Sequence, residues 1–248
     1  AREEGVDWEP LKDLCAKAYF LLDNDFHLPP VKIFLEKKAP VGAGLGGGSA
    51  DAAFTLKALN EICGLGLSDE KLSEYASKLG SDCAFFVWNR PMIGTGRGEI
   101  LEPFDLDLEG YEVKVLVPEG VSVSTAEAYS GIVPRQGGGS IGTTDVSLCS
   151  TPPLASQSEA PVPPLSVPRV AASAAPILPP PELKTVLGRP VEEWKGLLVN
   201  DFETTVFKAH PELEAIKQSL YDSGAVYAAM SGSGSAVFGI YKEIKNYD

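Results

Sequence analysis

The sequence predicts a protein that combines α-helices and β-strands, and three observations describe its organisation. Its 248 residues suffice for one large domain or for two domains of about 100–150 residues each. Segments that alternate like strands are interspersed with segments whose apolar residues recur at helical spacing. A change of composition at about residues 136–181 interrupts the second half.

Composition and charge exclude several classes of protein. Hydrophobic residues make up 44% of the chain and charged residues 22%, as in ordinary globular proteins. With 34 Asp and Glu against 21 Lys and Arg, the net charge is −13. We therefore do not expect a nucleic-acid binder, because affinity for a phosphate backbone comes from clustered Lys and Arg. A phosphorylated ligand would instead be bound locally, by backbone N–H groups or a metal ion.

The cysteines and the apolar segments bear on cellular location. The four cysteines stand singly, without the spacing of a zinc site or a CxxC motif, which indicates reduced thiols. No apolar run approaches the roughly 18 residues that span a bilayer, and the first residues do not resemble a signal peptide. We expect a cytoplasmic protein that does not act on a membrane, as a monomer or a homodimer. The start without Met is compatible with a cut in a longer chain.

The first half is predicted to contain three helices and two strands. Residues 31–35 alternate like a half-buried strand, and the apolar run 83–88 is too short for a typical helix and is expected to form a buried strand. Helices are expected over residues 11–22, from Ser49 or Asp51 to Gly64 or Gly66, and from an N-cap at Ser68 to Gly80.

The second half is predicted to combine strands with a helix and a flexible insertion. Strands are expected at residues 111–117, 225–229 and 236–241, and a helix from Pro211 at its first position to Gly224. The segment 136–181 holds 10 of the 20 prolines and only three charged residues, which is typical of a flexible linker. A Pro-rich ligand for a partner domain is the alternative.

A glycine-rich loop at residues 42–48 follows the first predicted strand and formally satisfies G-x-G-x-x-G. A dinucleotide-binding unit is excluded, because no second strand ending in Asp or Glu follows about 20 residues later. A Walker A loop is excluded because Gly48 stands where Lys is required before Ser49. Five glycines in seven residues let the backbone approach a ligand, and the following helix start offers N–H groups to phosphates. The alternative is a glycine-rich turn that requires only positive φ.

Four motifs in this order resemble those of the GHMP kinases, the superfamily of galactokinase, homoserine, mevalonate and phosphomevalonate kinases. They are P-V-G-A-G-L-G-G-G-S-A-D-A-A at 40–53, L-G-S-D-C-A-F-F at 79–86, G-R-G-E at 96–99 and M-S-G-S-G-S at 230–235. The first is most similar to the branch that phosphorylates the 2-hydroxyl of a cytidine-diphosphate-linked methylerythritol, a small-molecule substrate of the non-mevalonate isoprenoid pathway.

This resemblance implies an α+β, two-domain GHMP kinase fold, with a ribosomal protein S5 domain 2-like N-terminal domain at residues 1–105 and a ferredoxin-like C-terminal domain at residues 106–248. It also implies ATP and Mg²⁺ as cofactors and an active site between the domains.

The resemblance implies that Asp82 is catalytic. Phosphoryl transfer has a loose transition state, so a carboxylate that accepts or orients the proton of the acceptor hydroxyl fits this role. An aspartate that only satisfies backbone N–H groups of its turn is the alternative. The implied ATP-binding residues are Pro40, Val41, Gly42, Ala43, Gly44, Leu45, Gly46, Gly47, Gly48, Ser49 and Ala50.

The resemblance implies further contacts to metal and substrate. Ser49 would place its hydroxyl on Mg²⁺ or a phosphate, a role that is compatible with a plain N-cap. Asp82 and Thr125 would touch the substrate. Tyr129 would stack on the cytosine ring, with a contact within an amphipathic helix as the alternative. The glycines of 230–235 would let a hairpin pass close to the phosphate loop, unless they only form a tight turn.

One departure from the family pattern concerns the N-terminus. Members of this branch begin with a strand that carries a P-A-K-I-N-L type motif, whose lysine lies beside the catalytic aspartate. Nothing in residues 1–34 resembles that motif, so we expect a family member that lacks its first strands. Two other hypotheses stay open: a GHMP kinase of the homoserine or mevalonate type, and a nucleotide-binding protein without catalytic activity.

Overall fold

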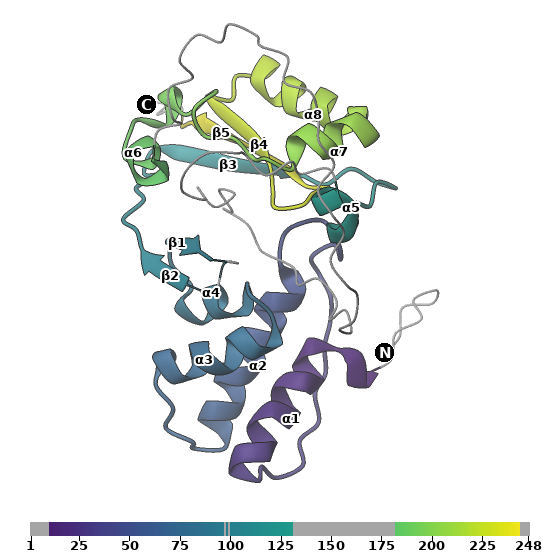
Figure 1. Ribbon diagram of the computed structural model, residues 1–248, viewed down its shortest axis with the longest axis vertical. Helices are drawn as coiled ribbons and strands as arrows, with labels where there is room; N and C mark the ends of the chain where they lie inside the picture. Colours follow the sequence, from purple (N-terminus) through teal and green to yellow (C-terminus); the bar gives the residue numbers. More distant parts are fainter. Residues whose placement is uncertain (1–9, 97, 99, 131–181, 244–248) are drawn as a thin grey trace, which may run out of the picture.

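The computed structural model describes residues 10–96, 98, 100–130 and 182–243. The insertion predicted at 136–181 therefore lies outside the described residues. Figure 1 shows two groups of elements: helices with a small hairpin from the first half of the chain, and a sheet with further helices from the second half.

The helices of the first half pack around one apolar core. They are η1 (Pro10–Lys12), α1 (Leu14–Phe26), α2 (Gly47–Ile62), α3 (Asp69–Leu79) and α4 (Cys83–Trp88). In α2, the buried residues Ala52, Leu56 and Leu59 recur at helical spacing, and the helix packs against α1, α3 and α4. The helices predicted over 11–22 and 68–80 are confirmed.

The helix starts show how far capping can be predicted. Asp13 Oδ1 accepts a hydrogen bond of 2.8 Å from the backbone at the start of α1, and Ser68 caps α3 as predicted. The start predicted for α2 is wrong. α2 begins at Gly47, after Gly46 with its left-handed φ of 65°, so Ser49 is the third residue of the helix and not its N-cap. Glycine has low helix propensity, which is why the pattern placed the start later.

The strand predicted at residues 31–35 is absent, and this prediction is wrong. The segment has no regular secondary structure, and Phe34 is 90% exposed. A strand needs a neighbour to satisfy its N–H and C=O groups, and among the described residues no strand pairs with this segment. It forms instead the irregular connection from α1 to the glycine loop.

The buried strand predicted at 83–88 is also wrong, because this run forms the helix α4. Cys83, Ala84 and Val87 are fully buried at helical spacing, and α4 packs against α2 and α3. Six consecutive apolar residues fit a buried strand or a buried helix equally well, so packing decides. Asp82 consequently precedes a helix.

A two-stranded hairpin follows α4. β1 (Met92–Thr95) pairs with β2 (Ile100–Pro103) in antiparallel register, with Thr95 opposite Ile100. The stretch 96–99 that resembles a family motif connects them, and only Gly96 and Gly98 of it are described.

The second half is built on an antiparallel sheet. Its strands β3 (Tyr111–Leu116), β4 (Tyr227–Met230) and β5 (Val237–Lys242) lie in the order β3-β5-β4 among the described residues. Val237 lies opposite Leu116 on one side and Met230 on the other. The three strands predicted for this half are confirmed, each within two residues of its predicted bounds.

Two layers cover the two faces of this sheet (Figure 1). They contain α7 (Glu203–Ala209) and α8 (Pro211–Asp222) on one face, and α6 (Leu183–Leu187) and η2 (Val191–Glu193) on the other. Along β4, Ala228 and Met230 pack with the first layer, and Tyr227 and Ala229 with the second. This period of two is that of a strand buried on both faces. The helix predicted from Pro211 is confirmed as α8.

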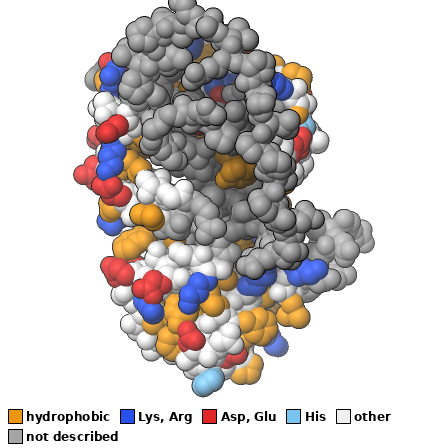
Figure 2. Space-filling model, viewed as in Figure 1, with side chains coloured by type: hydrophobic (Ala, Val, Ile, Leu, Met, Phe, Trp, Pro, Cys, Tyr) orange, Lys and Arg blue, Asp and Glu red, His pale blue; other side chains and the backbone are white. Residues whose placement is uncertain are grey.

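The surface carries side chains of every kind. Figure 2 shows acidic, basic and hydrophobic side chains interspersed over the described part of this face. No helix within the described ranges has both the length and the apolar character required to cross a membrane.

Candidate active site

The glycine loop turns sharply before α2. Gly42, Gly44 and Gly46 have φ of 75°, 72° and 65°, left-handed values that destabilise a residue with a Cβ. Because α2 begins at Gly47, its first N–H groups lie at the end of this loop. Such N–H groups, together with the helix dipole, favour an anion such as phosphate.

A turn near the C-terminus packs against the glycine loop. Ser231 Oγ donates a hydrogen bond of 2.8 Å to the carbonyl oxygen of Gly44, and the N–H of Ala236 donates one of 2.9 Å to that of Ala43. A Cβ on Gly44 would lie 2.2 Å from the carbonyl oxygen of Ser231, so only glycine fits. The close approach predicted for the segment 230–235 is therefore confirmed.

A pocket of about 240 Å³ lies beside the loop. Residues 40–49 line it together with Asp82, Thr125 and Ser233, which come from three other parts of the chain. The structure thus brings together most of the residues that the sequence proposed for the site. Ala50 and Tyr129 are not among the described residues that line this pocket.

Asp82 lies in the turn between α3 and α4 and is buried, with 5% of the residue exposed. Gly80 precedes it, and the N–H of Cys83 donates a hydrogen bond of 3.2 Å to the carbonyl oxygen of Gly80. The Asp82 side chain makes no capping hydrogen bond to α4, all of whose residues are described. Capping of this helix therefore does not explain the buried carboxylate.

The helix that follows Asp82 is held in place from α2. Lys57 on α2 donates a hydrogen bond of 2.6 Å from Nζ to the carbonyl oxygen of Val87, near the C-terminal end of α4. A positive charge there also interacts favourably with the helix dipole. Packed helices, rather than a long loop, thus determine where Asp82 lies.

Ser49 connects the glycine loop with the segment that carries Asp82. It lies in the first turn of α2, lines the pocket and forms a hydrogen bond with the thiol of Cys83. Burial raises the pKa of Cys83 to about 11, and the hydrogen bond with Ser49 opposes this rise only in part.

The oxygen donors of the pocket suit a cation that arrives with its own ligands. Among the described residues, no group of three or more His, Cys, Asp or Glu could hold a metal ion. The lining includes the carboxylates of Asp51 and Asp82 and the hydroxyls of Ser49, Thr125 and Ser233. Because Mg²⁺ commonly binds through one or two carboxylates together with substrate phosphates, this donor set fits Mg²⁺ that is carried by a nucleotide.

Thr125 and Tyr129 belong to the helix α5 (Thr125–Ser130), which contacts α7. Thr125 lines the pocket. The ring of Tyr129 meets that of Phe202 edge-on, with 4.8 Å between the ring centroids, and 43% of the residue is exposed. The helix contact considered as the alternative for Tyr129 is therefore present.

Two family models match this chain. The model of the GHMP kinases N terminal domain matches residues 13–90, and that of the GHMP kinases C terminal domain matches residues 185–245. Together they span more than half of the sequence. This chain belongs to the GHMP kinases.

Several relatives of this GHMP kinase carry the name 4-diphosphocytidyl-2-C-methyl-D-erythritol kinase. The one from Bacteroides fragilis is 46% identical over 236 residues, which are 95% of this chain and 70% of the relative. The one from Azobacteroides pseudotrichonymphae is 39% identical over 238 residues, which are 96% of this chain and 73% of the relative.

Solved structures support the fold of this GHMP kinase. The crystal structure of a 4-(cytidine 5'-diphospho)-2C-methyl-D-erythritol kinase matches with a TM-score of 0.65 and 28% identity, over 95% of this chain and 72% of that one. A homoserine kinase from Cytophaga hutchinsonii matches with a TM-score of 0.56 and 16% identity, over 97% of this chain and 70% of that one, which supports the fold alone. The predicted GHMP kinase fold is confirmed.

Sequence reasoning missed two lysines of the GHMP kinase pocket. Lys37 and Lys38 precede the glycine loop and line the pocket. Lys37 Nζ lies 2.5 Å from Asp51 Oδ2 and 3.7 Å from Asp13 Oδ2. Burial lowers the pKa of Lys37, but the hydrogen bond to Asp51 and the two negative charges outweigh it, so the pKa lies above its usual value. The signal was a Lys-Lys pair directly before the loop in an acidic chain.

Proposed function

We propose that this GHMP kinase transfers the γ-phosphoryl group of ATP to the 2-hydroxyl of 4-diphosphocytidyl-2-C-methyl-D-erythritol, a step of the non-mevalonate route to isoprenoid precursors. The observation that carries the proposal is the pocket in which the glycine loop meets Asp82 and Thr125. The identity of the acceptor is supported by relatives of that name, which reach 46% identity over 95% of the chain.

In this proposal the glycine loop and the start of α2 bind the phosphates of ATP. The glycines let the phosphates approach the backbone closely, and the N–H groups of the first helical turn donate to phosphate oxygens. Lys37 compensates the carboxylate of Asp51 at the pocket, and Lys38 also lines it, in a chain whose net charge is −13. Local charge and N–H donors thus offset the repulsion between an acidic protein and an anionic nucleotide.

Asp82 orients the acceptor hydroxyl and accepts its proton. Phosphoryl transfer passes through a loose transition state, so positioning and charge neutralisation contribute most of the acceleration. A carboxylate held between α3 and α4 has little freedom to move, which suits a positioning role. Proton transfer to a positioned base contributes about 10²–10⁴-fold.

Ser49 would hold Mg²⁺ together with phosphate oxygens of ATP. When bound, the ion supplies neutralisation of the charge that develops on the transferred group. The Ser49 hydroxyl lies on the same short helical turn as the proposed phosphate donors, so one element aligns both.

Thr125 and Tyr129 would bind the acceptor. Thr125 faces the pocket from α5, and Tyr129 would stack on the cytosine ring. Stacking of a base on an aromatic face contributes roughly 1–3 kcal/mol. The edge contact with Phe202 would restrain the Tyr129 ring before the base arrives.

The proposal is tested by measuring ADP release with ATP, Mg²⁺ and 4-diphosphocytidyl-2-C-methyl-D-erythritol. We expect turnover by the chain and a loss of about 10²–10⁴-fold in kcat for Asp82→Asn, because the amide cannot accept the proton. Asp105→Asn, a charge change at an exposed residue, is the matched control and should retain the activity.

The other outcomes separate the rival hypotheses. Turnover with homoserine or mevalonate in place of the cytidyl acceptor would identify a different GHMP kinase. Binding of a non-hydrolysable ATP analogue without turnover of any acceptor would identify a nucleotide-binding protein. Full activity of Asp82→Asn would remove Asp82 from the mechanism.

A further inference from the structure

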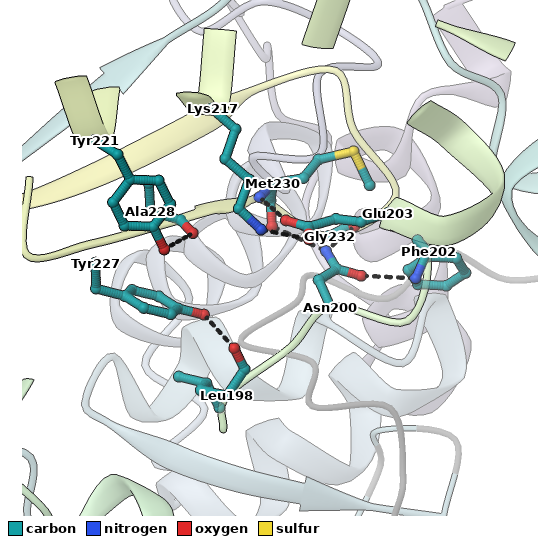
Figure 3. A network of polar contacts seen from close by, with 10 residues as sticks. All are labelled: Leu198, Asn200, Phe202, Glu203, Lys217, Tyr221, Tyr227, Ala228, Met230 and Gly232. Atoms are coloured by element: carbon teal, nitrogen blue, oxygen red, sulfur yellow. Dashed lines mark hydrogen bonds and ion pairs between the residues drawn. The ribbon is translucent and has the colours of Figure 1, made fainter. Parts of the chain in front are cut away.

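We infer that Asn200 and Glu203 are positioning residues that hold the turn at 230–235 where it shapes the glycine loop. The inference rests on the proposed function, which assigns that loop to the phosphates of ATP. Figure 3 shows both side chains between the start of α7 and the end of β4. Neither residue is among the described residues that line the pocket, so both would act through the turn.

Asn200 forms hydrogen bonds to two backbone groups of the turn. Its Nδ2 donates hydrogen bonds of 2.9 Å to the carbonyl oxygen of Met230 and 2.8 Å to that of Gly232 (Figure 3). Its Oδ1 accepts a hydrogen bond of 2.9 Å from the N–H of Phe202. The amide uses both its protons and its oxygen, so three bonds determine its orientation. A carboxylate of the same shape could not donate either bond to the turn.

Glu203 also binds the start of the same turn, at Met230. It is a buried residue, 9% exposed, and its Oε1 accepts a hydrogen bond of 2.8 Å from the N–H of Met230. Its Oε2 lies 2.6 Å from Lys217 Nζ of α8, which compensates the buried charge. The N–H and the C=O of Met230 are thus both held by side chains. A buried polar network with its bonds satisfied fixes one conformation.

The turn that this network restrains is the one that contacts the loop. Ser231 lies between the two carbonyl groups held by Asn200, and its hydroxyl donates to the carbonyl oxygen of Gly44. The 2.2 Å between a Cβ on Gly44 and the Ser231 carbonyl oxygen shows how closely the two backbones approach. Any displacement of the turn therefore breaks the bond to Gly44 or moves the loop.

Tyr227 provides a matched control in the same region. Its hydroxyl is buried and donates a hydrogen bond of 3.2 Å to the carbonyl oxygen of Leu198 (Figure 3). This bond also joins β4 to the segment before α7, but it does not involve the turn. Tyr227→Phe therefore removes a buried hydrogen bond without releasing residues 230–235.

The first test compares Asn200→Asp with Tyr227→Phe in steady-state kinetics. We expect Asn200→Asp to raise the KM for ATP about tenfold and to leave the KM for the acceptor within about twofold. Tyr227→Phe should leave both values within about twofold. A parallel rise of both KM values, or equal effects of the two substitutions, would overturn the inference.

A double substitution tests whether Asn200 acts through the turn. Ser231→Ala removes the hydroxyl that bonds to Gly44 and should also raise the KM for ATP. If both side chains act along one path, the double variant should show no more than the larger single effect. Multiplication of the two effects would show that Asn200 acts by another route, contrary to the inference.

A third measurement needs no ligand and no turnover. Hydrogen–deuterium exchange of peptides that cover residues 40–49 should be several-fold faster in Asn200→Asp than in the wild type, and unchanged in Tyr227→Phe. If the wild type shows no turnover, the proposed function fails, and the exchange rates still decide the inference. Unchanged exchange of the loop in a folded Asn200→Asp variant would overturn it.

A milder variant keeps the test decisive if Asn200→Asp does not fold. Glu203→Gln combined with Lys217→Met replaces the hydrogen bond from the Met230 N–H to a charged carboxylate with a weaker one to a neutral amide, and it leaves no buried charge unpaired. The same selective rise in the KM for ATP and the same faster loop exchange are expected, each about threefold. Values equal to the wild type would contradict the inference.

Discussion

Gly44 occupies a position where the backbone and its surroundings both exclude a side chain. Its φ is 72°, and a Cβ would lie 2.2 Å from the Ser231 carbonyl oxygen. We expect Gly44→Ala to lower the free energy of unfolding by about 3 kcal/mol, of which about 1–2 kcal/mol comes from the left-handed backbone and the rest from displacement of the turn. Urea denaturation measures this loss.

A substitution at Gly120 separates the cost of the left-handed backbone from the cost of displacing the turn. Gly120 has a similar φ of 74°, but a Cβ there would meet no heavy atom within 4 Å. Gly120→Ala should therefore lower the free energy of unfolding by only about 1 kcal/mol. Equal losses for Gly44→Ala and Gly120→Ala would show that the contact between loop and turn contributes nothing.

Cys15 should be nearly inert toward alkylation. It is 2% exposed, and burial raises the pKa of its thiol from 9.0 to about 11. At pH 8 the reactive thiolate fraction is then about a hundredfold lower than for an ordinary thiol, and it rises only as the pH approaches 11. Mass spectrometry of peptides after brief iodoacetamide treatment at pH 8 should show modification at the half-buried Cys63 and almost none at Cys15. Equal modification of both would contradict the buried position of Cys15.

For single residues, the sequence predicts those features that depend on residues close by in the chain. The glycine density of 42–48 predicts a loop of positive φ, and three of its glycines have it. Lys37 had a local signal, the Lys-Lys pair before the loop, whereas Asn200 escaped prediction because its role depends on partners in distant segments. The Asn200 amide, for instance, bonds to carbonyl groups 30 and 32 residues away, and no local pattern records that distance.

Among the elements, α4 is a short helix that depends on its neighbours. A helix of six residues is too short to be stable alone, so its conformation comes from packing and from the bond between Lys57 and Val87. We expect Lys57→Met to lower the free energy of unfolding by about 2 kcal/mol, because a charged donor to a part-buried carbonyl group is lost. Chemical denaturation with circular dichroism measures it.

Lys71→Met is the control at the same scale. Lys71 pairs with Glu74 on the exposed face of α3 at 2.5 Å. An exposed pair of this kind contributes little, so the free energy of unfolding should change by no more than about 0.5 kcal/mol. A larger loss for Lys71→Met than for Lys57→Met would contradict the importance assigned to the α4 anchor.

Prediction of the elements succeeded for the helices with a long periodic pattern and for the strands of the sheet, and it failed for two short runs of the first half. The helices α1, α3 and α8 carry several turns of apolar spacing, and each was predicted. The runs 31–35 and 83–88 have five and six residues, so the choice between strand, helix and irregular chain depended on partners. For 83–88 these partners were α2 and α3, whose packing face no local pattern reveals.

At the scale of the whole molecule, the pocket is lined by both halves of the chain. Thr125 and Ser233 face it from the second half, and the glycine loop and Asp82 from the first. A ligand at this site should therefore stabilise the two halves together. At a concentration of a hundred times its Kd, a non-hydrolysable ATP analogue with Mg²⁺ should add about 2.7 kcal/mol and raise the Tm by about 5–10 °C.

Differential scanning calorimetry distinguishes the outcomes of this experiment. A shift of the whole transition would support a site shared by both halves. Two transitions, of which only one moves with the analogue, would place the nucleotide within one half. The control for the charge of the nucleotide is a scan without the analogue, in buffer that sodium chloride brings to the same ionic strength.

The hydrogen bond between Ser231 and Gly44 also has a consequence for folding during synthesis on the ribosome, because its partners are 187 positions apart in the sequence. At a synthesis rate of about 5–20 residues per second, roughly 10–40 s pass between the emergence of the loop and that of its partner. A ribosome-bound chain in this interval has the glycine loop without the turn that packs against it, so the loop reaches its final packing only after the last strands appear.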